Sequence, residues 1–394
     1  MTLRLLLILG ALTAFGPLAI DFYLPAFPAL ARAFGTDVDQ VQLSLSAYFV
    51  GIALGQLIYG PLADRFGRRP PLLAGITLFT LASLGCALAP SLDWLIGARF
   101  VQALGGCAGM VIARAVVRDL CDPLNTARVF SQLMLVMGVA PILAPAAGGL
   151  MLQVLGWQSI FIGLALFSAL CLLAVWLWLP ESFPAGEVPA PLSGAFAHYR
   201  RLLGEGEFMG HALTGAFAMA GMFAYITASP FVFIELYGIS ESSYGWLFGA
   251  NAAGFILMAQ VNAQLVRRHG PAFLLPRTVA AYLLFAAVLV ALTWSQPASV
   301  WPLLPPLFIC LASLGCIIPN ASACAMAGQA SHACSASALL GFLQFGIAAP
   351  VAALVAFFHD GSALPMSLAI ALCAAASLLA ALLTLWRAAR TATV

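Results

Sequence analysis

The sequence predicts an all-helical integral membrane protein whose twelve transmembrane helices form two bundles of six. Three observations support this fold class. Hydrophobic residues make up 63% of the 394 residues and charged residues only 8%, whereas a soluble domain carries about 25% charged residues. Long apolar runs alternate with short polar connections along the whole chain. A weak internal similarity indicates that a six-helix unit occurs twice.

Twelve apolar runs are long enough for helices that cross the hydrocarbon core of a bilayer, which takes roughly 20 residues. They cover residues 5–30, 41–61, 72–90, 93–117, 128–153, 157–179, 208–235, 243–265, 274–294, 300–325, 335–358 and 363–386. The first run is too long for the apolar core of a signal peptide, so we expect an uncleaved first helix.

The arginines distinguish the two sides of the membrane. All 16 basic residues are arginines, and one set of alternating connections and termini carries most of them: Arg4, Arg65, Arg68, Arg69, Arg118, Arg128, Arg200, Arg201, Arg267, Arg268, Arg277, Arg387 and Arg390. The opposite connections carry only Arg32. Because arginine-rich connections stay in the cytoplasm, both termini are predicted to be cytoplasmic. With a net charge of only +2, this distribution does not indicate a nucleic-acid partner.

The longest connection, residues 181–206, is rich in Pro, Gly and Glu and is predicted to link two units, residues 1–180 and 207–394. One alignment of these units superimposes Leu62–Gly67 on Leu265–Gly270, Gly51 on Gly254 and Gly138 on Gly341. Two parallel repeats of six helices are typical of a large class of secondary transporters.

Four motifs, in order along the chain, resemble those of the major facilitator superfamily. The charged stretch Gly60–Pro71 (GPLADRFGRRPP) is similar to its signature between helices two and three, and Leu95–Gly105 (LIGARFVQALG) to its fourth-helix motif. Gly138–Gly149 (GVAPILAPAAGG) resembles the fifth-helix motif of drug/proton antiporters. Pro17–Pro28 (PLAIDFYLPAFP) and the seventh-helix run AMAGMFAYITASPFVFIE resemble the bicyclomycin-resistance (Bcr/CflA) branch.

This resemblance covers nearly the whole chain and implies the major facilitator fold. It also implies a proton-coupled antiporter that exports apolar or amphiphilic drugs, such as chloramphenicol- or bicyclomycin-like antibiotics, across the bacterial inner membrane by alternating access. The expected partners are a small-molecule drug, protons and the lipid bilayer, and the expected state is a monomer without cofactors. The alternative keeps the fold but exports a metabolite such as an amino acid or a sugar.

Two charged residues inside the apolar runs are candidates for proton coupling. Asp21 lies roughly 14 Å from the outer end of the first run, and Arg99 lies roughly 10 Å inside the fourth. Ionised side chains at this depth should face a cavity or each other. Apolar burial and a nearby arginine act in opposite directions on a carboxyl group, so Asp21 could exchange a proton when its surroundings change. A static ion pair between the two residues is the alternative interpretation.

Four more side chains are candidates for the wall of a substrate cavity. Gln102 lies one helical turn from Arg99 on the same face, and Tyr48 reaches a similar level in the second run. Met222 and Tyr225 belong to an aromatic- and methionine-rich stretch that suits a broad apolar pocket. Packing inside the protein or against lipid is the alternative role. Glu235, near the outer end of the seventh run, is expected at the membrane interface rather than at a second proton site.

The Gly60–Pro71 stretch predicts a tight cytoplasmic gate, in which Gly60 and Gly67 allow backbones to approach closely. By resemblance, Asp64 would meet the positive N-terminal end of the eleventh helix, and both Arg65 and Arg68 would pair with Asp119. The predicted gating residues are Gly60, Asp64, Arg65, Gly67, Arg68, Arg118 and Asp119. The repeat has Arg267 where Asp64 stands, so the gate is expected to be asymmetric.

The fifth run carries prolines, which kink helices, and glycines, which permit close packing. By resemblance this segment is the antiporter bend that packs against a helix of the other unit. Its predicted residues are Gly138, Pro141, Pro145, Gly148 and Gly149.

Two other classes of protein fit the sequence poorly. The apolar runs contain no H-E-x-x-H or G-x-S-x-G motif and no acidic pair at catalytic spacing. The nine cysteines show no metal-ligand spacing. An enzyme is therefore not predicted. A passive channel is disfavoured, because repeated halves around a central acid fit alternating access better.

Overall fold

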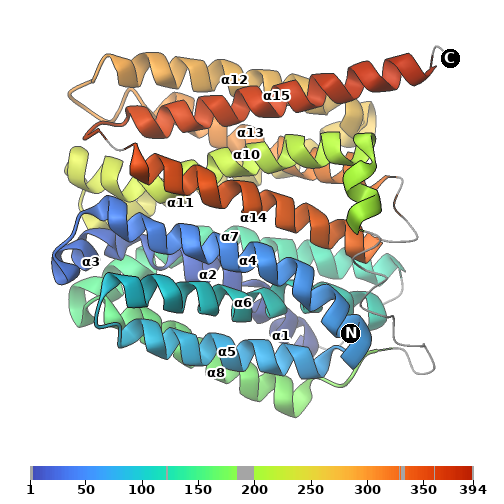
Figure 1. The fold of residues 1–394 in the computed structure, drawn as a ribbon, viewed down its shortest axis with the longest axis horizontal. Coiled ribbons are helices and arrows are strands. Elements are labelled where there is room, and N and C mark those ends of the chain that lie inside the picture. The colour runs from blue at the N-terminus through green and yellow to red at the C-terminus, as the bar shows by residue number, and fades with distance from the viewer. Residues whose placement is uncertain are drawn as a thin grey trace.

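The computed structural model describes residues 3–120, 123–183, 199–327, 329, 333–358 and 360–392. Within these residues the regular structure is helical throughout, without strands. The long helices run side by side along one axis, and both chain termini lie at the same end of the molecule (Figure 1). The all-helical fold class predicted from the sequence is confirmed.

All twelve predicted runs correspond to helices or broken helices. The first half contains α1 (Leu3–Thr13), α2 (Phe15–Asp21), the short 3₁₀ helix η1 (Leu24–Ala26), α3 (Phe27–Phe34), α4 (Val38–Phe66), α5 (Arg69–Ala87), α6 (Leu92–Leu120), α7 (Pro123–Leu155) and α8 (Gln158–Trp178). The second half contains α10 (Gly206–Pro230), the π-helix η2 (Phe231–Leu236), α11 (Glu241–His269), α12 (Pro271–Trp294), α13 (Leu304–Met326), α14 (Ala333–Phe357) and α15 (Leu364–Ala392).

Most of these helices have the length and composition of membrane spans. Among the described residues, nine helices are long and apolar enough to cross a bilayer, and the bent first helix makes ten. Large apolar side chains are exposed on the outer surface of the bundle, for example Leu166 and Leu170 on α8 and Leu372 and Leu379 on α15. Such an apolar exterior is what lipid requires, because the bilayer core offers no water to solvate polar groups.

The first span is interrupted twice. It bends by 40° between α1 and α2, and helical hydrogen bonding is interrupted again where α2 ends at Asp21 and η1 follows. Pro25 and Pro28, which have no backbone N–H to donate, lie just beyond the second interruption, as the sequence indicated. The break near Ala14 was not predicted. The consequence is that Asp21 ends a short helix instead of lying within a continuous one.

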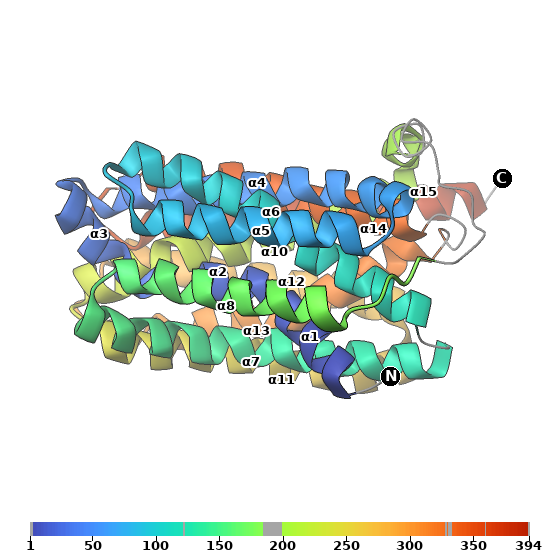
Figure 2. The same cartoon turned by 90° about the horizontal axis from the view of Figure 1, so that it is seen from below.

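The helices form two groups that meet along a central seam. In the first half, α6 packs on α4 and α5, and α5 packs on α8. In the second half, α10 and α12 each pack on α13 and α15. Figure 1 shows the blue-to-green first half below the yellow-green-to-red second half, and in Figure 2, seen from below, the first half lies in front of the second. Across the seam α4 packs on α14, and α7 packs on α11.

The internal repeat also appears in side-chain contacts. Thr80 and Ser168 share a hydrogen bond of 2.8 Å between α5 and α8 in the first half. Thr293 and Ser367 share one of 2.6 Å between α12 and α15 in the second half. Each bond joins the third and sixth spans of its own half. The predicted linker, residues 181–206, includes residues 184–198, which lie outside the described part of the chain.

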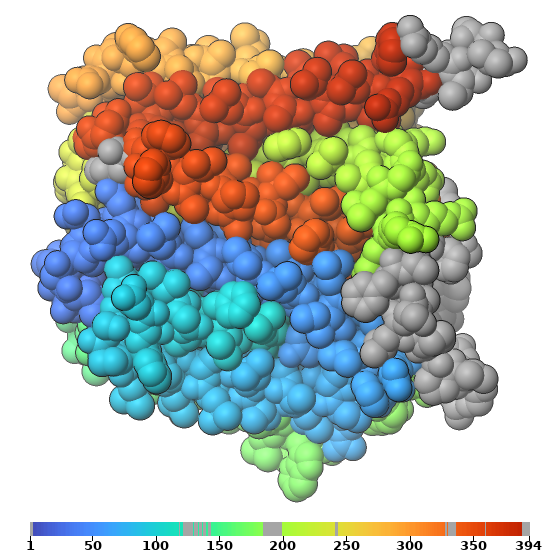
Figure 3. All heavy atoms as spheres, in the orientation of Figure 1, coloured from blue at the N-terminus to red at the C-terminus, as the bar shows by residue number. Residues whose placement is uncertain are grey.

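Aromatic side chains close the middle of the seam. The ring centroid of Phe49 on α4 lies 4.2 Å from that of Phe223 on α10 and 6.3 Å from that of Phe345 on α14. Phe223 and Phe345 are 5.4 Å apart. On the face drawn in Figure 3, blue atoms of α4 and orange-red atoms of α14 are in contact along the seam. The two halves are therefore joined by packed apolar surface at their centre.

Glycine allows α5 and α6 to approach closely. A Cβ atom added at Gly105 of α6 would lie 2.5 Å from the backbone nitrogen of Phe79 and 2.6 Å from the carbonyl oxygen of Gly75, both on α5. These atoms belong to a helical backbone and cannot move aside easily. Close packing of this kind is typical of membrane helices that meet through small residues.

Gly105→Val is expected to destabilise the protein by about 1–3 kcal/mol, because the added side chain must displace the backbone of α5. Thermal unfolding of the purified variant in detergent measures the effect. Gly97→Val on the same helix is the matched control, because a Cβ there would meet no atom within 4 Å. Equal unfolding midpoints for the two variants would contradict the close α5–α6 contact.

Candidate functional site

Arg99 is a fully buried cation at the centre of the first half. Its Nη1 donates to Gln102 Oε1 at 2.5 Å, and its Nη2 donates to the carbonyl oxygen of Ala19 at 2.9 Å. The guanidinium lies over the rings of Tyr48, at 4.2 Å, and Tyr23, at 4.6 Å from their centroids. Aromatic faces attract a desolvated cation, so neutral acceptors and rings hold this charge.

A chain of hydrogen bonds fixes the groups that surround Arg99. Gln102 Nε2 donates to Ser83 Oγ on α5 at 2.7 Å, and Ser83 donates to the carbonyl oxygen of Phe79. The hydroxyl of Tyr23 is bonded to Ser44 on α4 at 2.7 Å. Helices α2, α4, α5 and α6 therefore all help to orient one guanidinium. The sequence placed Tyr48 and Gln102 correctly at the level of Arg99.

Asp21 does not pair with Arg99 in this structure. The carboxyl is buried, with 4% of the residue exposed, and it forms no ion pair or hydrogen bond with any residue that the structure describes. The static ion pair, which was the alternative interpretation of the sequence, is not formed, because Arg99 is bound to Ala19 and Gln102 and because Asp21 ends α2. A role of Asp21 and Arg99 in proton coupling stays a prediction. The η1 segment that follows Asp21 packs against α10 and α11 of the second half.

The second half contributes a polar cluster that the sequence analysis did not identify. Asn251 Nδ2 on α11 donates to the hydroxyl of Tyr225 on α10 at 2.9 Å. Tyr244 and Ser229 share a hydrogen bond of 2.8 Å between the same two helices. Asn251 and Tyr244 stand in the apolar run 243–265, and their polar groups were the signal that could have identified them. Met222, also on α10, packs at the edge of the apolar core.

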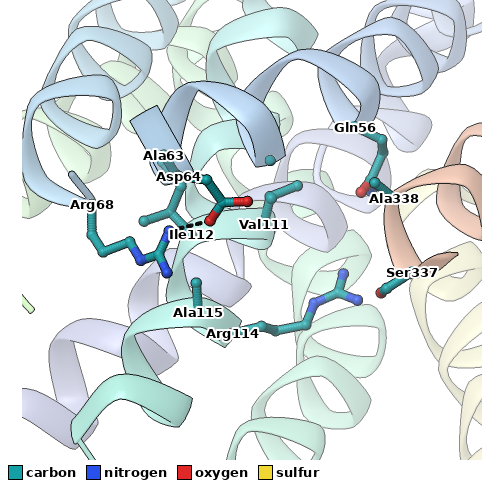
Figure 4. A pocket seen from close by; sticks show the side chains of 11 residues that line it. Gln56, Ala63, Asp64, Arg68, Val111, Ile112, Arg114, Ala115, Ser337 and Ala338 are labelled. Atoms are coloured by element: carbon teal, nitrogen blue, oxygen red, sulfur yellow. Dashed lines mark hydrogen bonds and ion pairs between the residues drawn. The ribbon is translucent and has the colours of Figure 1, made fainter. Parts of the chain in front are cut away.

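In the predicted gate, Arg68 pairs with two carboxylates. Its Nη1 lies 2.6 Å from Asp64 Oδ1, and its Nε lies 2.8 Å from Asp119 Oδ2. Burial disfavours the charged form of Arg68, but the hydrogen bonds to Asp119 and Asp64 outweigh burial and raise its pKa. Figure 4 shows the Arg68–Asp64 pair at the wall of a small pocket.

Glu181, which the sequence analysis did not identify, binds the backbone of the connection between α4 and α5. Its carboxylate accepts backbone N–H bonds from Arg68 at 2.8 Å and Arg69 at 3.1 Å, and from Ser182 and Phe183 at 3.0 Å each. Partial burial opposes its ionisation, but these four donors dominate and lower the pKa of Glu181 below its ordinary value. The available signal was an acid directly after Leu179-Pro180, at the end of the sixth run.

The two gate glycines differ. Gly67 has a φ of +86°, and a Cβ there would lie 2.7 Å from Glu181 Oε2. The contact between this loop and Glu181 therefore requires glycine. Gly60 was expected to permit a close backbone approach, but a Cβ there would meet no atom within 4 Å. This expectation is wrong because Gly60 faces the small pocket.

Arg65 also departs from its predicted role. It is exposed, and its guanidinium lies over the neighbouring Phe66 ring at 5.5 Å rather than forming the predicted pair with Asp119. Arg65 lies in the last turn of α4 and faces outward, whereas Arg68 lies at the N-cap of α5 and is buried, so only Arg68 reaches that carboxylate. The side chain of Arg118 lies outside what the structure describes.

A pocket of about 50 Å³ separates the gate from the beginning of α14. Asp64, Arg114 and Ser337 are among its lining residues, and Figure 4 shows Arg114 pointing toward Ser337. Asp64 and Ser337 of α14 thus line the same pocket, and the expected contact of Asp64 with the N-terminal end of that helix stays a prediction. Arg114 is a further lining residue that the analysis had not assigned.

The predicted bend on α7 packs against both halves. A Cβ at Gly148 would collide with the carbonyl of Phe22, in the interrupted first span. Gly245 of α11 packs on Pro145 and Ala146 of α7, with a Cβ there only 2.8 Å from the Ala146 Cα. Gly149 is buried in the same segment, whereas Gly138 and Pro141 lie outside the fully described positions. Glu235 is exposed in η2.

Three further observations describe what the chain is similar to. The family model "Major Facilitator Superfamily" matches residues 7–353. The "Uncharacterized MFS-type transporter YdgK" of Bacillus subtilis is 38% identical over 344 residues, which is 86% of this chain and 85% of that protein. The "Bicyclomycin resistance protein homolog" of Haemophilus influenzae is 30% identical, over 88% and 87%. "Multidrug resistance protein D" of Escherichia coli is 31% identical, over 86% and 85%.

Solved structures show the same fold at low sequence identity. A peptide transporter, POT, in complex with sulfate has a TM-score of 0.75 at 15% identity, covering 98% of this chain and 93% of that one. A D-xylose–proton symporter has a TM-score of 0.74 at 13% identity, covering 96% and 95%.

Two six-helix halves with buried polar groups at their seam define a multi-pass membrane transporter. The chain belongs to the major facilitator superfamily. Within that superfamily, its relatives support the bicyclomycin-resistance (Bcr/CflA) branch of multidrug efflux proteins. The resemblance stated from the sequence motifs is therefore confirmed.

Glu181→Gln is expected to destabilise the protein at neutral pH. A carboxyl whose pKa is lowered by folding stabilises the folded state above its ordinary pKa of 4.5, and this contribution is lost as the pH falls through the lowered value. The variant should therefore unfold at a lower temperature than the wild type at pH 7, and the difference should disappear in acid. Thermal unfolding across a pH series measures this.

Glu207→Gln, which removes an exposed carboxyl at the start of α10, is the control and should follow the wild type throughout. A Glu181→Gln difference that stays constant down to acidic pH would contradict the assignment of the effect to the ionised carboxylate.

Proposed function

We propose that the protein is a proton-coupled antiporter that exports apolar or amphiphilic drugs by alternating access. One observation carries the proposal: a buried carboxyl and a fully buried guanidinium lie in the same apolar region without being paired. Arg99 binds the carbonyl of Ala19, only two residues before Asp21. Because ionised groups in the membrane interior are costly when uncompensated, the protonation of Asp21 depends strongly on which groups surround it.

The proposed cycle follows from that dependence. In the outward-open state Asp21 binds a proton from the external solution and becomes neutral. In the inward-open state the proton leaves to the cytoplasm, and the carboxylate becomes available to Arg99 or to polar groups of the second half. A drug that enters the emptied cavity competes for the same space. Each outward movement of drug is then linked to an inward movement of protons.

The proposed substrate class follows from the side chains around the site. The rings of Tyr23, Tyr48 and Phe161 surround Arg99, while Met222 and Tyr225 provide apolar surface from the second half. Aromatic and methionine side chains adapt to varied shapes. Relatives named for bicyclomycin, chloramphenicol and multidrug resistance support the same class for this chain.

The proposal also includes an orientation and a division of the chain. Residues 1–180 and 207–394 would move as two units about the site, joined by the linker 181–206. The shared position of the termini in Figure 1 and the arginine-rich connections support a cytoplasmic location for both termini. We propose that the protein works as a monomer in the bacterial inner membrane.

Export of a metabolite is the alternative, and the shared fold of a peptide transporter and a xylose symporter is compatible with it. Resistance profiling of cells that express the protein, across a panel of antibiotics and dyes, separates the two. A drug exporter raises resistance to several unrelated apolar compounds, whereas a metabolite exporter does not. In either case, a protonophore should abolish export if the pH gradient drives it.

Asp21→Asn is expected to reduce drug-dependent proton exchange to background, because asparagine keeps the size of the side chain but binds no exchangeable proton. Proteoliposomes with an internal pH dye and external chloramphenicol measure the exchange. Asp93→Asn, at the exposed start of α6, is the control and should retain wild-type exchange. Active drug/proton exchange by correctly folded Asp21→Asn protein would overturn the proposal.

Asp64→Asn is expected to open the gate region more often. Arg68 loses one of its two charged partners, and a change of about 1 kcal/mol shifts a two-state population roughly fivefold. The measurement uses a cysteine introduced by Ser337→Cys in the pocket and a membrane-impermeant maleimide. The labelling rate of this cysteine should be higher by that factor with Asn at position 64 than with Asp64.

Arg65→Gln is the matched control for this measurement, because Arg65 pairs with no described carboxylate. Its labelling should equal that of the parent protein. If Asp64→Asn leaves both labelling and transport unchanged, Asp64 has no latch role.

A further inference from the structure

The segment that follows Asp21 packs against two helices of the second half that carry tyrosines. Helix α2 ends at Asp21, and η1, which begins three residues later, packs against both α10 and α11. Those helices carry Tyr225 and Tyr244, and both phenols interact electrostatically with Asp21. The carboxyl accepts no hydrogen bond from either of them in this structure. A small movement of the two halves could therefore create a direct contact.

The proton of the Tyr225 hydroxyl is available for such a contact. Asn251 Nδ2 donates to the Tyr225 oxygen at 2.9 Å, which makes the phenol an acceptor in that bond. No described residue accepts the phenol's own proton. The ring is held in place by stacking on Phe248, with centroids 5.6 Å apart and planes 16° apart. The Tyr225 hydroxyl is thus held in a fixed position, and its proton is available for a further hydrogen bond.

Tyr244 differs, because its hydroxyl is already engaged in a hydrogen bond. It shares a bond of 2.8 Å with Ser229, in which either hydroxyl can be the donor. When Tyr244 is the donor, it would have to break this bond before it could bind a carboxylate, whereas Tyr225 would not.

Few other charged groups compete for Asp21. Arg99 approaches from α6 but is bound to Ala19 and Gln102. Helix α8 contains no charged residue, and the charged residue of α7, Arg128, lies roughly 30 Å along that helix from the contact of Gly148 with the first span. Glu235 of η2 is exposed.

We infer that Tyr225 is the hydrogen-bond donor that the second half offers to ionised Asp21, and that Asn251 is the positioning residue that orients it. This inference rests on the proposed proton exchange at Asp21. It specifies the contact that couples proton exchange at Asp21 to the movement of the two halves. When Asp21 loses its proton, the carboxylate can bind a group of the opposite half, so deprotonation favours closure of the seam around η1. Protonation removes the acceptor and releases that contact.

The test is the pH dependence of Asp21 protonation in the full-length protein, measured without any drug. Dicyclohexylcarbodiimide is an apolar reagent that reacts with protonated carboxyl groups, and Asp21→Asn protein defines the background. Tyr225→Phe removes only the hydroxyl. Because a hydrogen bond to an ionised group is lost, the labelling midpoint should rise by about 1–2 pH units.

Three further variants sharpen the test. Tyr282→Phe removes a buried hydroxyl of the second half that has no described partner, and its midpoint should equal that of the wild type. Asn251→Leu should raise the midpoint by less than Tyr225→Phe. Adding it to Tyr225→Phe should change nothing more, because Asn251 acts through the phenol.

An unchanged midpoint in Tyr225→Phe, or an equal rise in Tyr244→Phe, would overturn the assignment. Absence of Asp21-dependent labelling at every pH would overturn it as well, because the carboxyl must be able to bind a proton. If Tyr225→Phe does not fold, the Asn251→Leu midpoint decides. A failure of the proposed drug export looks different, since chloramphenicol-dependent proton exchange would then be missing while the labelling midpoints still shift.

Discussion

The structure depends on holding one uncompensated cation in an apolar interior. Burying an ion costs several kcal/mol even after the protein relaxes, yet Arg99 is fully buried and has no carboxylate partner among the described residues. Two aromatic faces, a backbone carbonyl and Gln102 replace its water. The bond to the Ala19 carbonyl ties the interrupted first span to Arg99, because Ala19 belongs to α2. The position of Asp21 is thereby linked to the environment of the cation.

This linkage suggests how a small chemical change can move large helices. Asp21 follows a segment that Arg99 holds, and η1 after it packs on α10 and α11 of the other half. In the proposed cycle, Asp21 would have alternative partners: Arg99 in the first half and Tyr225 in the second. A ligand shifts an equilibrium only by its differential affinity for the two states. A proton that removes one acceptor provides such a difference.

The two ends of the molecule are held by different kinds of contact. At the C-terminal end of α4, charged groups of the first half dominate: Arg68 lies between Asp64 and Asp119, and Glu181 accepts hydrogen bonds from the loop backbone. Toward the other end, α7 and α11 meet through Gly245 and the Pro145–Ala146 backbone. In the proposed cycle, the charged contacts would open in water, and the close backbone contact would act as a pivot. The second half has similar helix packing but lacks the Asp64–Arg68 ion pair, because Arg267 stands at the position that corresponds to Asp64.

By itself the sequence determined the twelve helices and the family, because hydropathy, helical rise and local motifs are properties of short segments. It placed Gln102 and Tyr48 beside Arg99 for the same reason. Only the tertiary structure decided which groups meet. Arg99 binds Ala19 and Gln102 rather than Asp21, and Glu181 accepts a backbone hydrogen bond from Arg68, 113 positions away. Such partners depend on the rotation of each helix and on where the first span breaks, and contacts between distant segments fix both.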